Sequence, residues 1–261
     1  MKLIRSKSFS NGIVHALQTD DGFPVEVTDT FLPYYTRATL VRGTNALTSS
    51  ELGSRADRWL IGVSVQSGCP VGCKFCATGN LKRWRNLTAD EIVAQVLWVI
   101  SSHPELSFIS AKEHKILYTR MGEPFLNIEA VKEAIRRLDL MFPGVHHYVS
   151  TIGVKGSDFS WIKGNITLQL SLHSLHSDSR DWLIPYPNKL SIAELGQIRT
   201  TSNRKTTLNL ALVNDADFDI DAIDRFFDPK AFFIKLSPIN TNAVSDSNLI
   251  GEGVIEGKNL Q

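Results

Sequence analysis

Three cysteines, Cys69, Cys73 and Cys76, lie within the segment CPVGCKFCATG, and the 261-residue chain has no others. Structural zinc takes four ligands, usually two Cys pairs or a nearby His pair, and none of the seven histidines forms an H-x3-5-H pair close to these thiols. A cubane iron-sulfur cluster held by only three thiolates keeps one iron open for another ligand. From the residues alone, three explanations of the thiols stay open: an iron-sulfur cluster, zinc binding, and burial as small apolar side chains.

The composition is that of a globular protein. Hydrophobic residues make up 43% and charged residues 21%, which disfavours disorder. The first ten residues, MKLIRSKSFS, lack the apolar stretch of a secretory signal, and no apolar run reaches the length of a membrane span. We therefore expect a cytoplasmic protein with no membrane partner, in a reducing compartment that favours metal binding by the thiols over disulfides. The net charge of +1 gives no global sign of nucleic-acid binding.

Short β-branched segments alternate with helical patterns from residue 59 onward, which is typical of a parallel sheet built from strand-helix units. Six strands are expected, at residues 60–66, 115–119, 147–151, 166–172, 207–213 and 232–237. Helices are expected after the capping-box residue Thr88, and at residues 127–142, 158–162, 191–199 and 219–227. An open doubly wound sheet and a partial barrel both fit this order, and both gather ligands at the carboxyl ends of the strands. The cysteines directly follow the first of these strands.

The chain is predicted to have three parts. Residues 1–58 form an N-terminal β-rich extension and linker, with short strands GIVHALQ and PVEVTDTFL around the turn signal DDG. The linker is expected in TNALTSSELGSRADR. Residues 59–240 form the core, and residues 241–261 form a polar tail with at most one short element.

The cysteine segment, with the aromatic Phe75 before its last cysteine, resembles the motif of the radical S-adenosylmethionine (SAM) superfamily. Over about residues 60–240 the chain is similar to the rRNA adenine-C2 methyltransferases and their C8-modifying resistance relatives, through the ordered segments RNLTADEIVAQV, MGEPFLN, VSTIGV, QLSLHS, SRDWLIPYPNK, LVND and IKLSPIN. The resemblance implies an α/β fold, a partial (β/α)6 TIM-like barrel carrying a small N-terminal β attachment. It also implies a [4Fe-4S] cluster and SAM as cofactors, and a reductase such as flavodoxin or ferredoxin as a partner.

The resemblance further implies which residues contact SAM. Glu123 matches the acidic residue that meets the SAM amino group, Asn214 matches an asparagine near the ribose, and Asn240 matches a residue near the adenine. The remaining matches are Gly122, Ser150, Ser171, Leu172 and His173. Ordinary structural roles stay open: a helix-entry turn for Glu123, a strand-end cap for Ser150, a core histidine for His173 and a turn residue for Asn214.

Several features depart from the methyltransferases. Their two further cysteines are missing, because Gly62 stands seven residues before Cys69 and no cysteine follows Cys76. Without that nucleophile the covalent methyl-transfer route is closed. A helical RNA-recognition segment is not evident at the amino terminus. Arg120 replaces a small residue and is either a surface arginine or a cation near the substrate cavity. The stretch 82–85, KRWR, either contacts a nucleotide or packs at a helix entry.

These features predict a radical SAM enzyme that cleaves SAM to a 5'-deoxyadenosyl radical, which abstracts hydrogen from an unidentified substrate. The candidate substrates are a small molecule, a nucleotide, a peptide and RNA. One alternative is RNA adenine methyltransferase-like activity. Another is a non-catalytic metal-cluster-binding module, which the retained GEP and SLH segments and Asn214 disfavour because such a module needs no SAM pocket.

Overall fold

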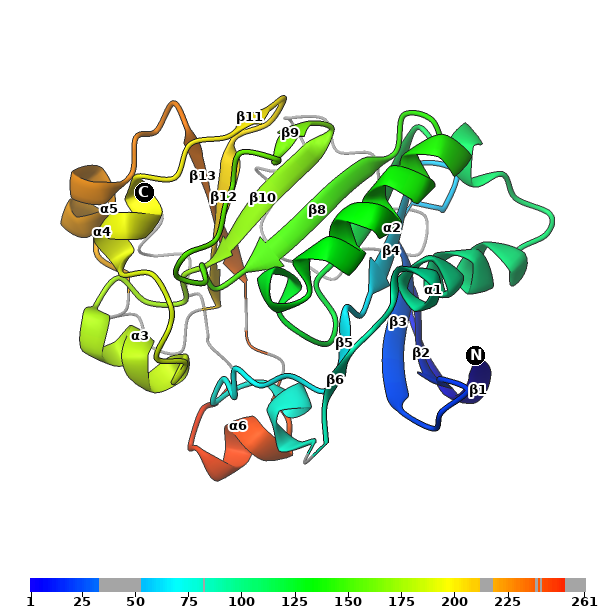
Figure 1. The fold of residues 1–261 in the computed structure, drawn as a ribbon, viewed down its shortest axis with the longest axis horizontal. Helices are drawn as coiled ribbons and strands as arrows, with labels where there is room; N and C mark the ends of the chain where they lie inside the picture. The colour runs from blue at the N-terminus through cyan, green and yellow to red at the C-terminus, as the bar shows by residue number, and fades with distance from the viewer. Residues whose placement is uncertain (33–52, 82, 212–217, 238, 240, 252–261) are drawn as a thin grey trace. The chain divides into compact units, whose positions relative to one another are not determined.

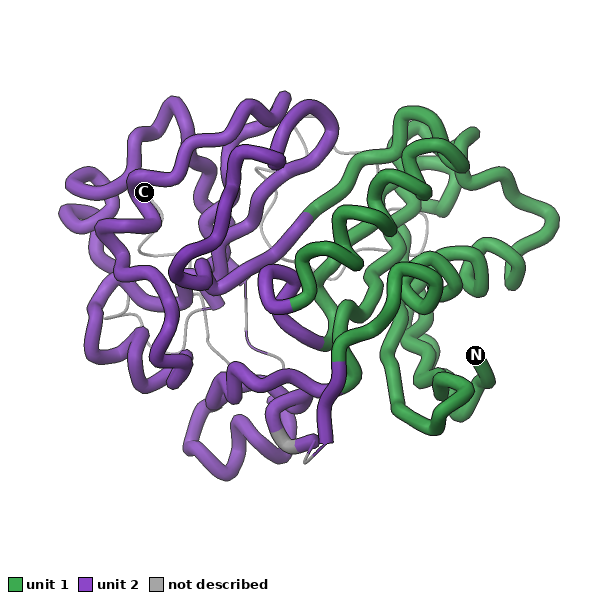
Figure 2. Tube along the Cα trace, viewed as in Figure 1, with its two compact units in different colours: residues 1–67, 86–121, 127–148 green, residues 68–85, 122–126, 149–261 purple. Residues whose placement is uncertain are grey.

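The computed structural model describes residues 1–32, 53–81, 83–211, 218–237, 239 and 241–251. The chain folds as two compact units (Figure 2). Unit 1 comprises residues 1–67, 86–121 and 127–148, and unit 2 comprises residues 68–85, 122–126 and 149–261. Most of the linker predicted at residues 44–58 lies outside the described residues. The three-part division at residues 58 and 240 stays a prediction.

Unit 1 is built on a sheet whose first four strands form an antiparallel meander (Figure 1). The meander comprises β1 (Lys2–Phe9), β2 (Gly12–Gln18), β3 (Pro24–Phe31) and β4 (Arg58–Val63). The next strand, β7 (Glu113–Tyr118), runs parallel to β4. Strand β8 (His146–Thr151) begins in unit 1 and ends in unit 2, and the short β5 (Gln66–Ser67) and β6 (Arg85–Asn86) precede α1. The β attachment predicted at the amino terminus is therefore present, with β1 as an unexpected additional strand.

Two helices, α1 (Ala89–Ser101) and α2 (Ile128–Met141), cover unit 1 and pack against each other. The predicted capping box starts α1: the Thr88 hydroxyl accepts from the Glu91 N–H at 3.2 Å, and Glu91 Oε2 accepts from the Thr88 N–H at 2.8 Å. Asn127 precedes α2 but makes no capping hydrogen bond. Its side-chain amide instead donates to the carbonyls of Val65 at 2.7 Å and Leu87 at 2.8 Å. Asn127 therefore ties the start of α2 to the loops that flank β5 and β6.

Unit 2 contains parallel strands joined by helices. After the end of β8 come β10 (Ile166–Ser171), β12 (Thr206–Ala211) and β13 (Phe232–Ser237), and β10 pairs in parallel with β12, as β12 does with β13. Strands β9 (Lys163–Gly164) and β11 (Thr201–Ser202) form a separate pair. The helices are α3 (Ser177–Leu183), α4 (Ile192–Gly196), α5 (Ile220–Phe226) and α6 (Ala243–Ser247). Short 3-10 turns are η2 (Ala77–Asn80), η3 (Phe108–Ser110, in unit 1) and η4 (Pro124–Leu126).

Each of the six predicted strands is present, so the mixed α/β class with parallel strands is confirmed. The helix predicted at residues 158–162 is wrong. Asp158 accepts hydrogen bonds from the N–H and the hydroxyl of Ser160 at 2.8 and 2.9 Å, which closes a local turn in place of a helix. Helix α4 ends at Gly196, earlier than expected, and α3 was not expected at all. Within the described part of the chain, every helix is too short or too polar to cross a membrane.

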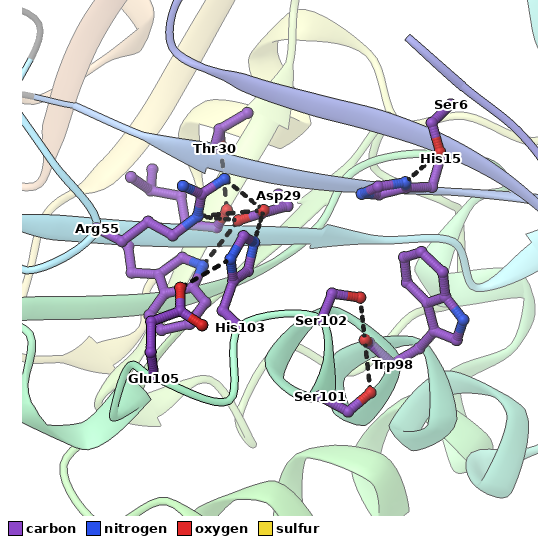
Figure 3. Close-up of polar contacts among 12 residues, drawn as sticks. Ser6, His15, Asp29, Thr30, Arg55, Trp98, Ser101, Ser102, His103 and Glu105 are labelled. Carbon is purple, nitrogen blue, oxygen red and sulfur yellow. Dashed lines mark hydrogen bonds and ion pairs between the residues drawn. The ribbon is translucent and has the colours of Figure 1, made fainter. Parts of the chain in front are cut away.

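A buried carboxylate organises the polar interior of unit 1 (Figure 3). Asp29 on β3 is 0% exposed and accepts hydrogen bonds from three side chains: Arg55 Nη2 at 2.6 Å, His103 Nε2 at 2.7 Å and Trp59 Nε1 at 2.9 Å. Burial by itself raises the pKa of Asp29, but the hydrogen bonds from Arg55, His103 and Trp59 outweigh it and hold the pKa below the ordinary value. Asp29 thus joins β3, the start of β4 and the loop after α1.

Replacing Asp29 by asparagine is expected to lower the free energy of unfolding by about 3 kcal/mol, because Arg55 loses its buried counter-charge. The stability contributed by Asp29 is present above its unfolded-state pKa of about 4 and is lost as the pH falls through the lower folded-state value. Urea unfolding at pH 7 and pH 3 measures both effects. The control is Asp57→Asn, which removes a surface ion pair with Lys112. An Asp29→Asn loss no larger than that of the control contradicts the assignment.

Candidate functional site

The three cysteines lie in a tightly turned loop of unit 2, between residue 68 and η2. All three are free and half-buried. The Cys73 carbonyl accepts from the Cys76 N–H at 3.1 Å, and the Cys76 carbonyl accepts from the Gly79 N–H at 3.1 Å. Gly68 enters the loop with φ +75°, where an added Cβ would lie 2.8 Å from Trp84 Cβ. The turns therefore fix how the thiols are spaced along the loop.

The negative charges that the thiolates and Glu123 would carry favour a cationic ligand in the loop. Burial, with a contribution from the Cys76 and Glu123 charges, raises the pKa of the Cys69 thiol to about 12. Burial and the charges of Cys76, Cys69 and Glu123 raise the pKa of Cys73 well above its usual value. The thiols thus interact electrostatically with one another, and a metal centre must displace their protons to bind.

The donor set fits a cluster better than one metal ion. Among the described residues, no group of three or more His, Cys, Asp or Glu side chains is arranged to hold a single metal ion. A structural zinc site would need a fourth ligand besides the three thiols. In a cubane each thiolate binds a different iron, so the three sulfurs need not meet at one point. The assignment of Cys69, Cys73 and Cys76 as cluster ligands stays a prediction that this donor set supports.

Glu123 lies in the same unit as the cysteines, between Gly122, whose φ is +100°, and η4. Its side chain is 4% exposed and accepts from the N–H groups of Phe125 at 3.1 Å and Ile152 at 3.0 Å. Burial raises the pKa of Glu123 to about 7, although hydrogen bonds from Thr151, Ile152 and Phe125 act to lower it. A buried carboxyl group that ionises near neutral pH is suited to pairing with an ammonium group.

Three more predicted SAM-site residues lie where β8 and β10 end. The hydroxyls of Ser150 and Ser171 are 3.5 Å apart. His173, with φ +61°, accepts the Ala211 N–H at ring atom Nδ1 over 3.1 Å, so its proton is on Nε2. Burial, assisted by Arg180, lowers the pKa of His173 to about 3, which keeps the ring neutral. The ring also packs edge-on against Phe75 in the cysteine loop, with centroids 4.8 Å apart.

The other predicted residues divide into two groups. The Leu172 side chain is fully buried, so its polar group is the backbone, whose N–H donates to the Asn209 carbonyl. Asn214, Asn240 and residue 82 of the KRWR stretch lie outside the described residues. Trp84 in that stretch is 49% exposed. None of these SAM or nucleotide contacts is tested, and all stay predictions.

Sequence analysis did not single out Arg180, a buried cation on α3. Arg180 is 2% exposed and donates to the carbonyls of Leu190 at 2.8 Å and Ile152 at 2.7 Å. Its Nε is buried with no hydrogen-bond partner, and its charge interacts with Cys73. Burial lowers the pKa of Arg180 to about 10, so the group stays protonated at neutral pH. The charge of Asp181 also acts on Arg180, and a buried cation whose charge interacts with Cys73 fits an anionic thiolate cluster. SRDW, the segment that contains Arg180, gives no signal of burial.

The polar tail also contributes to the site. Its described residues, 241–251, include the short helix α6, and the residues flanking that helix hold the cysteine loop. The side-chain amides of Asn242 and Asn248 donate to the carbonyls of Phe75 at 2.9 Å and Lys74 at 3.0 Å. The Lys74 N–H in turn donates to the Leu183 carbonyl at the end of α3, at 3.0 Å. The loop is therefore fixed from two sides by segments more than 100 residues away in the sequence.

Comparison with known proteins places this site in a family. The model of the Radical SAM superfamily matches residues 63–220. The chain is 39% identical over 175 residues to the probable dual-specificity RNA methyltransferase RlmN of Desulfitobacterium hafniense (strain DSM 10664 / DCB-2), covering 60% of this chain and 47% of the relative. It is 35% identical over 215 residues to the Gloeobacter violaceus protein of the same description, covering 77% and 60%. The chain thus spans about half the length of the curated relatives it matches.

A solved structure extends the likeness. The crystal structure of a radical SAM methyltransferase from Sphaerobacter thermophilus aligns with a TM-score of 0.63 and 25% sequence identity, covering 92% of this chain and 67% of that one. This match confirms the expected fold class, an α/β partial barrel with parallel strands. The chain belongs to the radical SAM superfamily and is an enzyme of that class, similar to the RlmN methyltransferases.

Proposed function

We propose that Cys69, Cys73 and Cys76 bind a [4Fe-4S] cluster and that SAM binds beside it in unit 2. The observation that carries the proposal is the grouping of three free thiols within electrostatic range of one another and of the buried Glu123 carboxyl. When bound, the two cofactors together supply reductive cleavage of SAM to a 5'-deoxyadenosyl radical, which removes hydrogen from the substrate.

The residues of the chain bind and orient the two cofactors. Glu123 pairs as a carboxylate with the SAM ammonium group, and Arg180 offsets the negative charge that the thiolates bring into a buried site. His173 stays neutral, supports Phe75 and offers its Nε2–H as a donor. The remaining proposed SAM contacts are Gly122, Ser150, Ser171, the Leu172 backbone, Asn214 and Asn240.

We propose that the radical abstracts hydrogen from a small molecule, a nucleotide or a peptide. A cytoplasmic reductase such as flavodoxin or ferredoxin would be the electron donor. RNA adenine methylation is the second candidate, because the relatives are described as probable RNA methyltransferases. A thiol-dependent route is disfavoured because Gly62 stands where the methyltransferases have a cysteine. The structure also leaves no space for a side chain there, since a Cβ at position 62 would collide with Thr28 Oγ1 and lie 3.2 Å from Arg120 Cδ. The non-catalytic module remains the alternative if SAM is never cleaved.

The test is anaerobic reconstitution with iron and sulfide, followed by reduction and chromatography for 5'-deoxyadenosine from SAM. Formation of this product supports the proposal. A reconstituted cluster that never cleaves SAM supports the non-catalytic module, and tight zinc without iron rejects the cluster. A parallel assay with isotopically labelled SAM and rRNA fragments tests methylation, and label in RNA adenine would establish the second candidate.

Replacing Asn242 and Asn248 together by alanine is expected to speed iron loss from the reconstituted protein at least about tenfold, because two hydrogen bonds that hold the cysteine loop are removed. The measurement is iron per chain over time in a chelator. Asn203→Ala, at an exposed turn of unit 2, is the matched control. Equal rates for the double variant and the wild type would show that α6 does not position the loop.

A further inference from the structure

Unit 1 carries a hollow of about 350 Å³ on its β meander. It is lined by four residues of β1 (Arg5, Ser6, Lys7 and Phe9), by Val14 and Ala16 of β2, by Glu26 of β3 and by Arg120, which follows β7. All of these residues belong to unit 1 and lie outside the proposed cluster and SAM site. The volume lies within the range of small-molecule pockets, roughly 300–1,000 Å³.

The lining of the hollow is cationic. Glu26 forms an ion pair with Arg120, and it is the one acidic side chain of the lining. Within the described part of the chain, neither Arg5 nor Lys7 has a carboxylate partner; Lys7 Nζ lies 5.0 Å from the centroid of the Phe9 ring. Two positive charges are therefore uncompensated. Lysine on an edge strand often serves only to prevent strand pairing, but that role does not require the additional, partly covered arginine.

Arg120 reaches the hollow because Gly62 has no side chain. The Arg120 chain passes over Gly62 in β4, and a Cβ at that position would lie 3.2 Å from Arg120 Cδ and 3.4 Å from Cγ. Burial lowers the pKa of Arg120, and Glu26 compensates its charge in the absence of another anion. The guanidinium thus pairs with the half-buried Glu26 carboxylate, and both side chains line the hollow. Glycine at position 62 is a spatial requirement of this arrangement.

We propose that this hollow binds a phosphorylated small molecule of mononucleotide size. Arg5, Lys7 and Arg120 would bind the phosphate oxygens, for which arginine offers paired donors in a fixed plane. The exposed Phe9 ring and the apolar β2 side chains would contact the planar or apolar body of the ligand. Glu26 would accept hydrogen bonds from polar groups of the ligand. The site does not depend on the cluster, so its test is independent of the proposed radical chemistry.

The experiment is isothermal titration calorimetry of the full chain with AMP at low salt, with adenosine and inorganic phosphate as comparison ligands. AMP is expected to bind, adenosine to bind at least about tenfold more weakly, and phosphate to compete with AMP. Arg5→Ala and Lys7→Ala are each expected to lower the AMP affinity about tenfold. Lys2→Ala, exposed on the same strand but outside the hollow, is the matched control and should change it less than about twofold.

Glu26→Gln is expected to change the AMP affinity in the opposite direction from Arg5→Ala and Lys7→Ala. Removing this carboxylate frees Arg120 and removes repulsion, so the AMP affinity is expected to rise several-fold. Thermal melting of each variant confirms that it is folded, which exposed β1 positions should allow. Absence of AMP binding at millimolar concentration overturns the proposal. A loss of AMP affinity in Lys2→Ala equal to that in Arg5→Ala or Lys7→Ala also overturns it. An affinity for RNA oligonucleotides that exceeds the affinity for AMP and grows with oligonucleotide length overturns it as well, because it indicates a nucleic-acid surface instead.

Discussion

Cys73→Ala is expected to reduce both iron retention and 5'-deoxyadenosine formation to background, a loss of at least about 100-fold. In the proposed cluster, two thiolates could not replace three as ligands, because the remaining iron would have to stay open to SAM. The charges of Cys69, Cys76 and Glu123 all act on Cys73, which makes it a suitable position for the test. The measurements are iron and sulfide per chain, the visible absorption of the cluster, and product chromatography.

Thr78→Ala is the matched control for this variant. Thr78 lies in η2, two residues after Cys76, and its backbone carbonyl, rather than its hydroxyl, accepts the turn hydrogen bond from Leu81. We expect this control to retain the cluster and its activity. Wild-type iron content and SAM cleavage in Cys73→Ala would contradict the assignment of the ligands. Circular dichroism of the metal-free variant separates loss of ligation from loss of folding.

Glu123→Gln is expected to weaken SAM binding about 100-fold at pH 8, because the buried carboxylate that we propose to pair with the SAM ammonium group is replaced by a neutral amide. The wild type should show a rising affinity with pH. Since burial raises the pKa of Glu123 to about 7, ionisation between pH 6 and pH 8 is expected to increase the SAM affinity about tenfold. In the variant this dependence should be absent. Equilibrium dialysis with labelled SAM measures both.

The same carboxyl group links SAM binding to stability. Its folded-state pKa is raised, so its contribution to stability is fully present below the unfolded-state value near 4.5 and is lost as the pH rises through about 7. The SAM-free protein is therefore expected to lose about 3 kcal/mol between these limits, and SAM should restore part of it. Asp178→Asn, an exposed carboxylate on α3, is the control and should leave the pH profile of SAM affinity unchanged. A pH-independent affinity in the wild type would show that Glu123 does not meet the ammonium group.

The sequence by itself determined the elements whose information is local. Period-two and helical patterns and the capping boxes at Thr88 and Ser191 are written in neighbouring residues, so the six strands, the starts of α1 and α4 and the α/β class could be predicted. The spacing of the three cysteines is equally local, and it was sufficient to indicate the superfamily that the comparison confirms. Local chemistry also misled once, at Asp158, where a side-chain turn replaced the expected helix.

Only the tertiary structure decided which distant residues serve the site. Arg180 becomes a buried cation acting on Cys73 because α3 returns to the cysteine loop, and Asn248 binds that loop from more than 170 residues away. In unit 1, the space beside Gly62 is taken by Thr28 and Arg120 from other segments. Burial and charge compensation depend on all groups packed around an atom, wherever they stand in the chain. A single sequence shows the residue types, while their surroundings exist only once the strands have paired.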